Sequence, residues 1–252
     1  MSVTRGEFLK SLGKSLPGMV LGSGTVAMQK LIGKIATVGG EPEAPAMTRL
    51  PEPAPLEIIH SGPSVRNQIA LTFDDGPTPG VTERILDEFK QRGLHATFFM
   101  IGQRIAAAPD LARRVVAEGH EAGNHTFTHP KLAELPLARA EEEIQNTQDV
   151  ISGTLGIHPS WFRPPYGSFR PDQAPLVHSR GMRIVSGNVD PRDWSQPGEE
   201  HIIDVIARDA KSGAIIICHD MHAQTANAIG TVLDKLIAAG LTPVTLTSLM
   251  AG

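Results

Sequence analysis

The sequence predicts an α/β protein in which about seven parallel strands form a closed or nearly closed (β/α) barrel. Three observations support this fold class. Short apolar runs alternate with segments of helical periodicity from residue 66 onward. Clusters of polar residues follow the strands, as expected where parallel strands end on one face. A length of 252 residues suits one large (β/α) domain. An open doubly wound sheet is the alternative that the same alternation allows.

Strands and helices are expected to follow one another in a regular order. The first strand, Gln68–Phe73, is apolar, and apolar residues then recur at helical spacing from Val81 to Phe89 until Gly93 ends the helix. Further strands are predicted at residues 96–101, 120–124, 160–163, 183–186, 214–218 and 243–246. Further helices are predicted at residues 109–118, 136–155, 171–180, 198–211 and 225–239. No change of strand direction is evident, which favours a barrel over an open sheet.

The N-terminal part of the chain differs from the rest. Residues 1–39 are basic and then weakly apolar, and the apolar stretch 16–28 is shorter than the ~18 residues that span a bilayer. We expect an export-signal-like or membrane-proximal segment there. Residues 40–56 are rich in Pro and Glu and are predicted to be a linker, and residues 57–252 to be the folded domain. The sequence thus predicts an exported protein, periplasmic or secreted, with a cytoplasmic protein as the alternative.

Charge and cysteine content exclude several classes of function. The formal net charge is −4 at pH 7 and no block of Lys or Arg stands out, so no nucleic-acid partner is expected. The only cysteine is Cys218, which excludes an internal disulfide and a cysteine-rich structural zinc site. Oligomeric state is not predictable from these features.

Two carboxylates and two imidazoles form the strongest chemical signal. Asp74 and Asp75 end the first strand immediately before Gly76 and Pro77, and His125 and His129 lie four residues apart after the third predicted strand. One carboxylate and two histidines make a catalytic metal site that leaves coordination positions open for water and substrate. The second carboxylate is then available as a base, so this set predicts a metal-assisted hydrolase.

Five polar clusters follow five of the predicted strands. Because the carboxyl ends of parallel strands share one face of a barrel, these clusters are expected to converge on a single cleft. They are Asp74–Asp75, His125–His129, Arg163–Tyr166, Asp190–Trp194 and His219–His222.

Taken together and in this order, these motifs resemble those of the polysaccharide deacetylase family, carbohydrate esterase family 4. The motifs are Thr72–Pro77, His125–His129, Arg163–Tyr166, Asp190–Trp194 and Ile217–His219, with Ile217 at a position where the family more often has leucine. The resemblance covers roughly residues 66–250. It implies that residues 57–252 are a polysaccharide deacetylase catalytic domain, and the family's fold is a distorted (β/α) barrel.

The resemblance implies a role for each matching residue. Asp75, His125 and His129 would hold a divalent metal, with Zn2+ the expected ion and Co2+, Ni2+ or Fe2+ as alternatives. Asp74 would be the general base.

The remaining motif residues would serve the base, the acid and the substrate. Arg163 would pair with Asp74 and hold it ionised. His219 would be the general acid and Asp193 its partner. Tyr166 would bind the developing oxyanion through its backbone N–H, and the rings of Tyr166 and Trp194 would border the cleft.

Three nearby residues and six histidines have no firm assignment. Asp190 precedes Pro191 and could simply end its strand. Asp220 and His222 could supply a fourth ligand, but a solvated loop is expected. No role is claimed for the histidines outside the motifs, which are His60, His95, His120, His158, His178 and His201.

The predicted function is removal of N-acetyl groups from N-acetylglucosamine units of a glycan, such as peptidoglycan or a chitin-like oligosaccharide, with release of acetate. O-acetyl (xylan-type) esterases and cyclic-amide hydrolases share the family's metal site and remain alternatives. A non-catalytic glycan-binding protein is the alternative from another class, although both Asp74 and His219 are present. A structural zinc site would require four protein ligands, and the motifs supply three.

Overall fold

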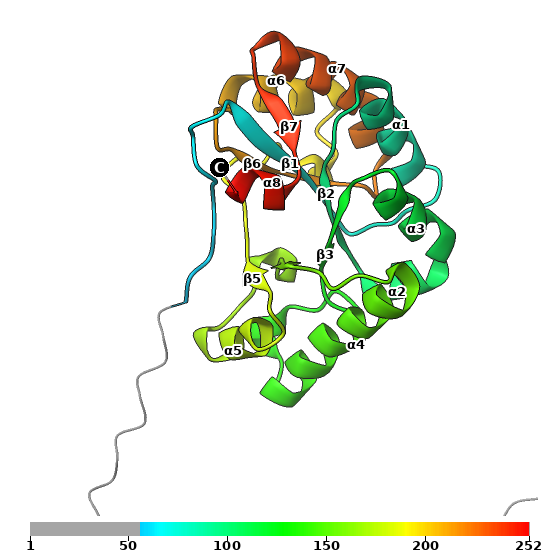
Figure 1. The fold of residues 1–252 in the computed structure, drawn as a ribbon, viewed down its shortest axis with the longest axis vertical. Coiled ribbons are helices and arrows are strands. Elements are labelled where there is room, and N and C mark those ends of the chain that lie inside the picture. Colours follow the sequence, from blue (N-terminus) through cyan, green and yellow to red (C-terminus); the bar gives the residue numbers. More distant parts are fainter. Residues whose placement is uncertain (1–55, 252) are drawn as a thin grey trace, which may run out of the picture. The chain divides into compact units, whose positions relative to one another are not determined.

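The computed structural model describes residues 56–251, in which a curved parallel sheet is surrounded by helices (Figure 1). All strand pairs are parallel, in the order β5-β4-β3-β2-β1-β6, and β7 also pairs with β1. The predicted set of seven parallel strands is therefore confirmed. The strands are β1 (Gln68–Asp74), β2 (Thr97–Met100), β3 (Glu121–Asn124), β4 (Trp161–Phe162), β5 (Arg183–Ile184), β6 (Ile215–His219) and β7 (Thr242–Val244).

The two edges of the sheet meet through the chain that follows β5. Val189 forms an isolated parallel bridge with Ile216, and the N–H of Ile217 donates to the carbonyl of Val189 at 2.9 Å. The sheet is thus nearly closed, but by a single bridge instead of a full ladder. This is the distorted barrel that the sequence motifs implied, and not an open doubly wound sheet.

Helices cover the outside of the sheet, with α1, α3, α6 and α7 along one part of its circumference and α2, α4 and α5 along another (Figure 1). Helix α1 ends as predicted at Gly93, whose φ of 61° is left-handed. Helix α3 begins with a proline at its first turn, where no N–H is needed. The helices are α1 (Thr82–Arg92), α2 (Gly102–Ala107), α3 (Pro109–Ala117), α4 (Leu137–Leu155), α5 (Ala174–His178), α6 (Glu199–Asp209), α7 (Ala223–Ala238) and α8 (Leu246–Met250).

Side chains of β1 alternate between the helices and the interior of the barrel. Leu71 and Phe73 are fully buried in the cluster beneath the helices, whereas Ala70 belongs to the interior cluster with Phe99 and Ile215. The same alternation directs Thr72 and Asp74 inward. The carboxyl end of β1 therefore directs Asp74 into the barrel interior.

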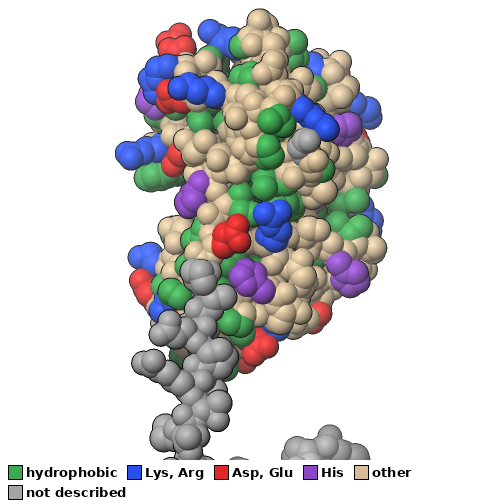
Figure 2. Space-filling model, turned by 60° about the vertical axis from the view of Figure 1, so that its left-hand side comes forward, with side chains coloured by type: hydrophobic (Ala, Val, Ile, Leu, Met, Phe, Trp, Pro, Cys, Tyr) green, Lys and Arg blue, Asp and Glu red, His purple; other side chains and the backbone are tan. Residues whose placement is uncertain are grey.

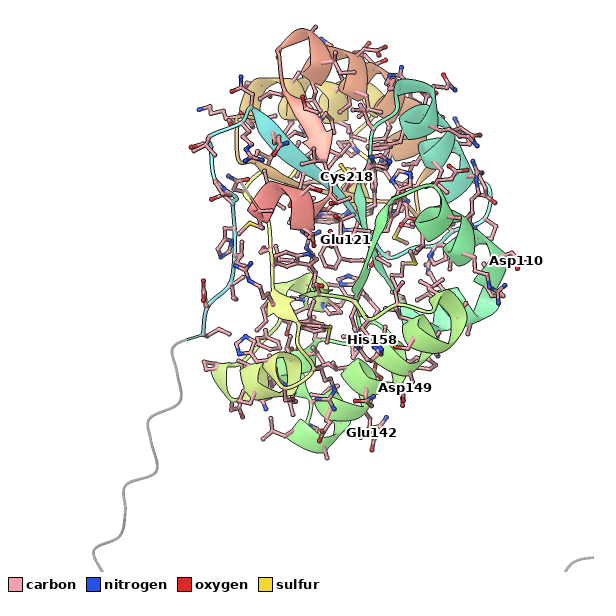
Figure 3. All side chains as sticks on the ribbon, viewed as in Figure 1. Asp110, Glu121, Glu142, Asp149, His158 and Cys218 are labelled. Carbon is pink, nitrogen blue, oxygen red and sulfur yellow. The ribbon has the colours of Figure 1, made fainter. Side chains whose placement is uncertain are left out.

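The C-terminal segment differs from the prediction. Residues 243–246 were expected to form a strand, but Thr245 accepts a hydrogen bond from the N–H of Ser248 and begins helix α8. Leu246 and Leu249 of this helix pack into the interior cluster. Glu121, which lies beside α8 in Figure 3, accepts from the N–H of Thr247 at 3.1 Å. Helix α2 was not predicted at all, because its six residues are too few for a clear helical period.

The predicted export segment and nearly all of the predicted linker lie outside the described residues. Only Leu56 of the linker falls inside them, and it packs against the buried cluster that contains Phe162 and Val177. Within residues 56–251 no helix is long and apolar enough to cross a membrane.

The surface visible in Figure 2 carries mixed charge, and the single cysteine is buried. On the face shown in Figure 2, acidic and basic side chains of the described residues are interspersed, without a broad basic field. Cys218 lies among the strands and is fully buried (Figure 3). Burial raises the pKa of its thiol well above the usual value. The thiol therefore behaves as a small apolar group.

Candidate metal centre and acid–base site

The backbone after β1 brings two adjacent carboxylates to the same end of the barrel. Neighbouring strand residues point to opposite faces, but Asp75 has a φ of 78°, which lies outside the strand conformation. His129 and Tyr166 also have positive φ values, of 63° and 58°. Such conformations are costly for residues other than glycine, and their concentration here marks a site whose geometry the surrounding fold enforces.

Asp75, His125 and His129 meet at one point. Asp75 Oδ1 lies 3.4 Å from His125 Nε2 and 3.0 Å from His129 Nε2, and among the described residues only these three form a group able to hold a metal ion. Asp75 and His125 are buried. The predicted ligand residues are therefore brought together from the ends of two strands, β1 and β3.

The chemistry of this group fits a bound cation. Nδ1 of His125 lies 2.7 Å from the backbone carbonyl of Arg163, which can only accept, so Nδ1 carries the proton and Nε2 presents a lone pair. Asp75 Oδ1 is buried with no hydrogen-bond partner. Lone pairs that converge in a buried position repel one another unless a cation lies between them.

The Asp75 carboxyl is held in its anionic form. Burial alone would raise its pKa, but the nearby imidazoles of His125 and His129 outweigh burial and hold the pKa well below its usual range. A carboxylate is the form that binds a divalent ion.

A buried glutamate holds the loop that carries the two histidines. Glu143 of α4 accepts from the N–H groups of Phe127 and Thr128 at 2.9 and 2.8 Å and from the hydroxyl of Thr128 at 2.7 Å. This residue was not predicted from the sequence, because it lies in an amphipathic helix about fourteen residues from the nearer histidine. The only signal was its position on the buried face of that helix.

Asp74 and Arg163 form a buried ion pair beside the three ligands. Arg163 Nη1 lies 2.7 Å from Asp74 Oδ1, and the same nitrogen donates to the hydroxyl of Thr72 at 2.7 Å. Nη2 donates to the backbone carbonyl of Ser186 at 2.9 Å. The other oxygen of Asp74 lies 4.0 Å from His125 Nε2. Arg163 thus fixes one carboxylate oxygen and leaves the second next to the metal group.

His219 and Asp193 form a second fixed pair. His219 Nδ1 lies 2.7 Å from Asp193 Oδ1, and Asp193 Oδ2 accepts from the backbone N–H of His219 at 2.8 Å and from the Thr225 hydroxyl at 2.7 Å. Asp193 is 0% exposed. Burial would lower the pKa of His219, but Asp193, with the nearby charges of Asp74 and Asp75, raises it to about 9. His219 therefore retains a proton at neutral pH.

One cleft of about 610 Å³ is lined by the three metal-group residues, by Asp74 and Arg163, and by His219. Tyr166 and Trp194 are 68% and 53% exposed and line its opening. The Tyr166 hydroxyl lies 3.1 Å from His129 Nδ1. All nine predicted site residues except Asp193 line the cleft directly, and Asp193 contacts it through His219.

Asp220 is not in a solvated loop, and that prediction is wrong. It is 1% exposed and its Oδ2 accepts from the Thr82 hydroxyl at 2.6 Å, while its Oδ1 has no partner. Burial, helped by the charge of Asp75, raises its pKa to about 7. His222 is half-buried and precedes α7, and Asp190 lines the cleft with Oδ1 accepting from the N–H of Arg192 at 2.7 Å.

Gly76, which directly follows Asp75, has no room for a side chain. A Cβ there would overlap the carboxylate of Asp220. We therefore expect Gly76→Ala to displace the turn, to cost about 1–3 kcal/mol of stability and to weaken divalent-ion binding, as measured by thermal unfolding and metal titration.

The matched control is Gly153→Ala, at an exposed position of helix α4 where no atom lies within 4 Å of the added Cβ. This change should raise stability by up to about 1 kcal/mol. A Gly76→Ala protein with unchanged unfolding and metal affinity would show that the turn is not constrained by Asp220.

Comparison of sequences reveals related proteins. The model of the family described as polysaccharide deacetylase matches residues 61–185. The chain is 38% identical over 181 residues to peptidoglycan-N-acetylmuramic acid deacetylase PdaC of Bacillus subtilis (strain 168), covering 72% of this chain and 38% of that protein. It is 41% identical over 161 residues to a chitooligosaccharide deacetylase of Rhizobium leguminosarum bv. trifolii, covering 64% and 74%. The chain thus spans about two fifths of the length of PdaC.

Comparison of structures gives the same grouping. The structure of PdaC from Bacillus subtilis superimposes with a TM-score of 0.71 and 36% identity, covering 75% of this chain and 92% of that chain. BA3943 from Bacillus anthracis, a CE4 family pseudoenzyme, superimposes with a TM-score of 0.74 and 27% identity, covering 77% and 69%. These likenesses confirm the fold class. Since a pseudoenzyme has the same fold, catalysis must be argued from the site residues.

Proposed function

Since the chain belongs to the polysaccharide deacetylase family, we propose that it is a metal-dependent hydrolase that removes N-acetyl groups from N-acetylglucosamine units of a glycan. The glycan is peptidoglycan or a chitin-like oligosaccharide, and the products are acetate and a free amine. One observation carries the proposal: a base candidate, Asp74, held by Arg163, and a protonated acid candidate, His219, line the same cleft as the metal group.

The proposed ligands are Asp75, His125 and His129. When bound, a divalent ion would polarise the acetamido carbonyl and lower the pKa of a water molecule in the cleft. Two imidazoles and one carboxylate suit zinc, and cobalt, nickel and iron are also accepted by such sites. We propose zinc as the ion.

Asp74 takes the proton of the attacking water. Its Oδ1 is fixed by Arg163 at 2.7 Å, so its Oδ2 is the atom that receives the proton. The water oxygen forms a bond to the acetamido carbon as the O–H bond breaks. Arg163 is then a positioning residue, because it acts through Asp74.

The backbone N–H of Tyr166 stabilises the oxyanion that forms at the acetamido carbonyl. The left-handed conformation of Tyr166 belongs to a tight turn in which the N–H groups of Gly167 and Ser168 donate to Pro164 and Pro165. A fixed backbone donor costs no reorganisation when the charge develops. The exposed rings of Tyr166 and Trp194 offer apolar faces to the sugar.

His219 donates a proton to the departing nitrogen as the carbon–nitrogen bond breaks. An amide anion cannot leave at neutral pH, so the nitrogen must be protonated in the same step. Since Nδ1 of His219 faces Asp193, Nε2 is the atom that donates. Asp193 keeps the imidazolium charged and oriented.

The alternatives predict different results with the same protein. An O-acetyl (xylan-type) esterase or a cyclic-amide hydrolase would use the same metal group on another bond. A non-catalytic glycan-binding protein has no need of a base and an acid, which argues against that class. Acetate release should be measured with chitooligosaccharide, peptidoglycan and acetylxylan, each with and without chelator. Release from the first two, abolished by chelator, is the expected result, and release from acetylxylan alone would contradict the proposal.

We also propose that the protein is exported, to the periplasm or beyond. The support is the basic and then apolar composition of residues 1–39. The membrane-proximal alternative for this segment lies outside the described residues. Fractionation of cells that express the full chain, followed by N-terminal sequencing, tests the export proposal, and recovery of the intact chain from the cytoplasm alone would contradict it.

A further inference from the structure

Residues 56–62, which we call the cleft strap, cross the carboxyl side of β5 and help to form the wall of the cleft. Ile59 forms an isolated parallel bridge with Val185, with its N–H donating to Ile184 at 3.0 Å and its carbonyl accepting from Ser186 at 2.8 Å. Gly62 donates to the carbonyl of Gly213 at 2.8 Å. The strap is therefore fixed by hydrogen bonds at its middle and at its C-terminal end.

Side chains of the strap alternate between the core and the cleft. Ile59 is buried in the interior cluster, whereas its neighbours Ile58 and His60 both line the cleft that contains Asp75 and His219. This is the alternation of an extended segment. The strap thus directs one apolar and one polar side chain toward whatever occupies the cleft.

Burial separates the floor of the cleft from its rim. Asp74, His125 and Arg163 are almost completely buried, whereas His60 is exposed, as are Tyr166 and Trp194. The reacting acetamido group must reach the buried floor. The parts of the glycan that extend beyond the reacting sugar must then lie against the exposed rim, which includes His60.

Residues 56–60 precede the segment matched by the family model, which begins at residue 61. The imidazole of His60 can both donate to and accept from sugar hydroxyls, and Ile58 offers an apolar surface beside it. These are the two kinds of contact that a sugar ring makes.

We propose that the cleft strap forms a binding subsite for the sugar unit next to the one that is deacetylated, with His60 hydrogen-bonded to a hydroxyl of that unit. This inference rests on the proposed function and deepens it. The substrate is then an N-acetylated oligosaccharide of at least two units, and a single N-acetylhexosamine is a poor substrate because it leaves the strap unused.

The test compares a tetramer and a monomer of N-acetylglucosamine. His60→Ala should lower kcat/KM for the tetramer, relative to kcat/KM for the monomer, by about fivefold. The change should appear as a higher KM for the tetramer. The lost hydrogen bond stabilises the bound substrate and the transition state equally, so its removal raises KM and leaves kcat unchanged. His60→Gln, which keeps a donor and an acceptor, should restore part of the ratio. The matched control is His158→Ala, an exposed histidine between α4 and β4 and thus at the opposite, N-terminal end of the strands. It should keep the wild-type ratio.

A binding measurement separates this proposal from the proposed function. Calorimetric titration of the tetramer into metal-free protein should show about fivefold weaker binding by His60→Ala than by wild type. If that difference is found but no glycan releases acetate, the proposed function fails and the subsite stands. If acetate is released but His60→Ala leaves the ratio and the binding unchanged, the subsite is overturned. Lack of tetramer binding by the wild-type protein would also overturn it.

Discussion

Asp74→Asn is expected to lower the rate of acetate release by at least about a hundredfold while metal binding is retained. The asparagine keeps the shape of the side chain and can still accept the hydrogen bond from Arg163, but it cannot take a proton from water. Removal of a general base typically costs about 10²–10⁴-fold in rate. Steady-state acetate release and metal content of the same preparation test this expectation.

The change also leaves the charge of Arg163 uncompensated, so folding must be measured alongside activity. Circular dichroism and thermal unfolding show whether the variant is folded at the assay temperature. Asp149→Asn is the matched control, because it removes the same charge on the outer helix α4, away from the barrel (Figure 3). A folded, metal-loaded Asp74→Asn protein with near wild-type turnover would disprove the assignment of the base.

His219→Gln is expected to be nearly as damaging for the N-acetyl substrate, with a loss of about 10²–10⁴-fold. The loss should depend on the leaving group. An amine must be protonated as it departs, whereas a nitrophenolate departs from an aryl acetate without help. Hydrolysis of an aryl acetate by the variant should therefore stay close to wild type. Equal losses on the two substrates would show that His219 does not act as the acid.

The pH profile gives an independent check of the same role. The acid form of His219 is required, and its pKa is raised to about 9, so wild-type kcat/KM should be constant through neutral pH and should fall as the pH rises through about 9. In His219→Gln this alkaline decline should be absent, because the titrating group is gone. A decline at the same pH in the variant would assign it to another group.

The convergence of the metal group was predictable from the sequence because it follows from strand order. Asp75 and His125 end strands that are both parallel and both near the centre of the sheet, so their side chains reach the same end of the barrel. The pairing of Arg163 with Asp74 and of Asp193 with His219 came from the family resemblance, and both pairs lie at 2.7 Å. The left-handed backbone conformation of Asp75 could not be predicted from the sequence, because it depends on the surrounding packing.

Other parts of the site depend on long-range contacts that leave no local pattern. Glu143 supports the histidine loop from a helix whose sequence reads as ordinary amphipathic periodicity. Asp220 follows His219 in a stretch that resembles a loop, and its burial depends on contacts with Gly76 and Thr82, which are distant in the sequence. His60 belongs to a short extended segment, and its place in the cleft depends on the bridge between Ile59 and Val185.

In the fold too, elements set by local sequence were predictable, and elements set by long-range packing were not. The strands near the middle of the sheet were predicted to within about two residues, because each is a compact apolar run. The last predicted strand included Leu246, which instead begins a helix that closes the end of the barrel interior. An apolar run of four residues fits either structure, and tertiary packing decides between them.

The central claim is that Asp75, His125 and His129 together bind one divalent ion on which hydrolysis depends. Its most direct test is a titration of chelator-treated protein with zinc, with bound metal and acetate release measured in the same samples, for wild type and for His129→Ala. We predict that wild-type binding and activity rise together and level off at one ion per chain, and that His129→Ala binds far more weakly and stays inactive at the same zinc concentration. Full activity of the metal-free protein, or equally tight binding by His129→Ala, would contradict the account.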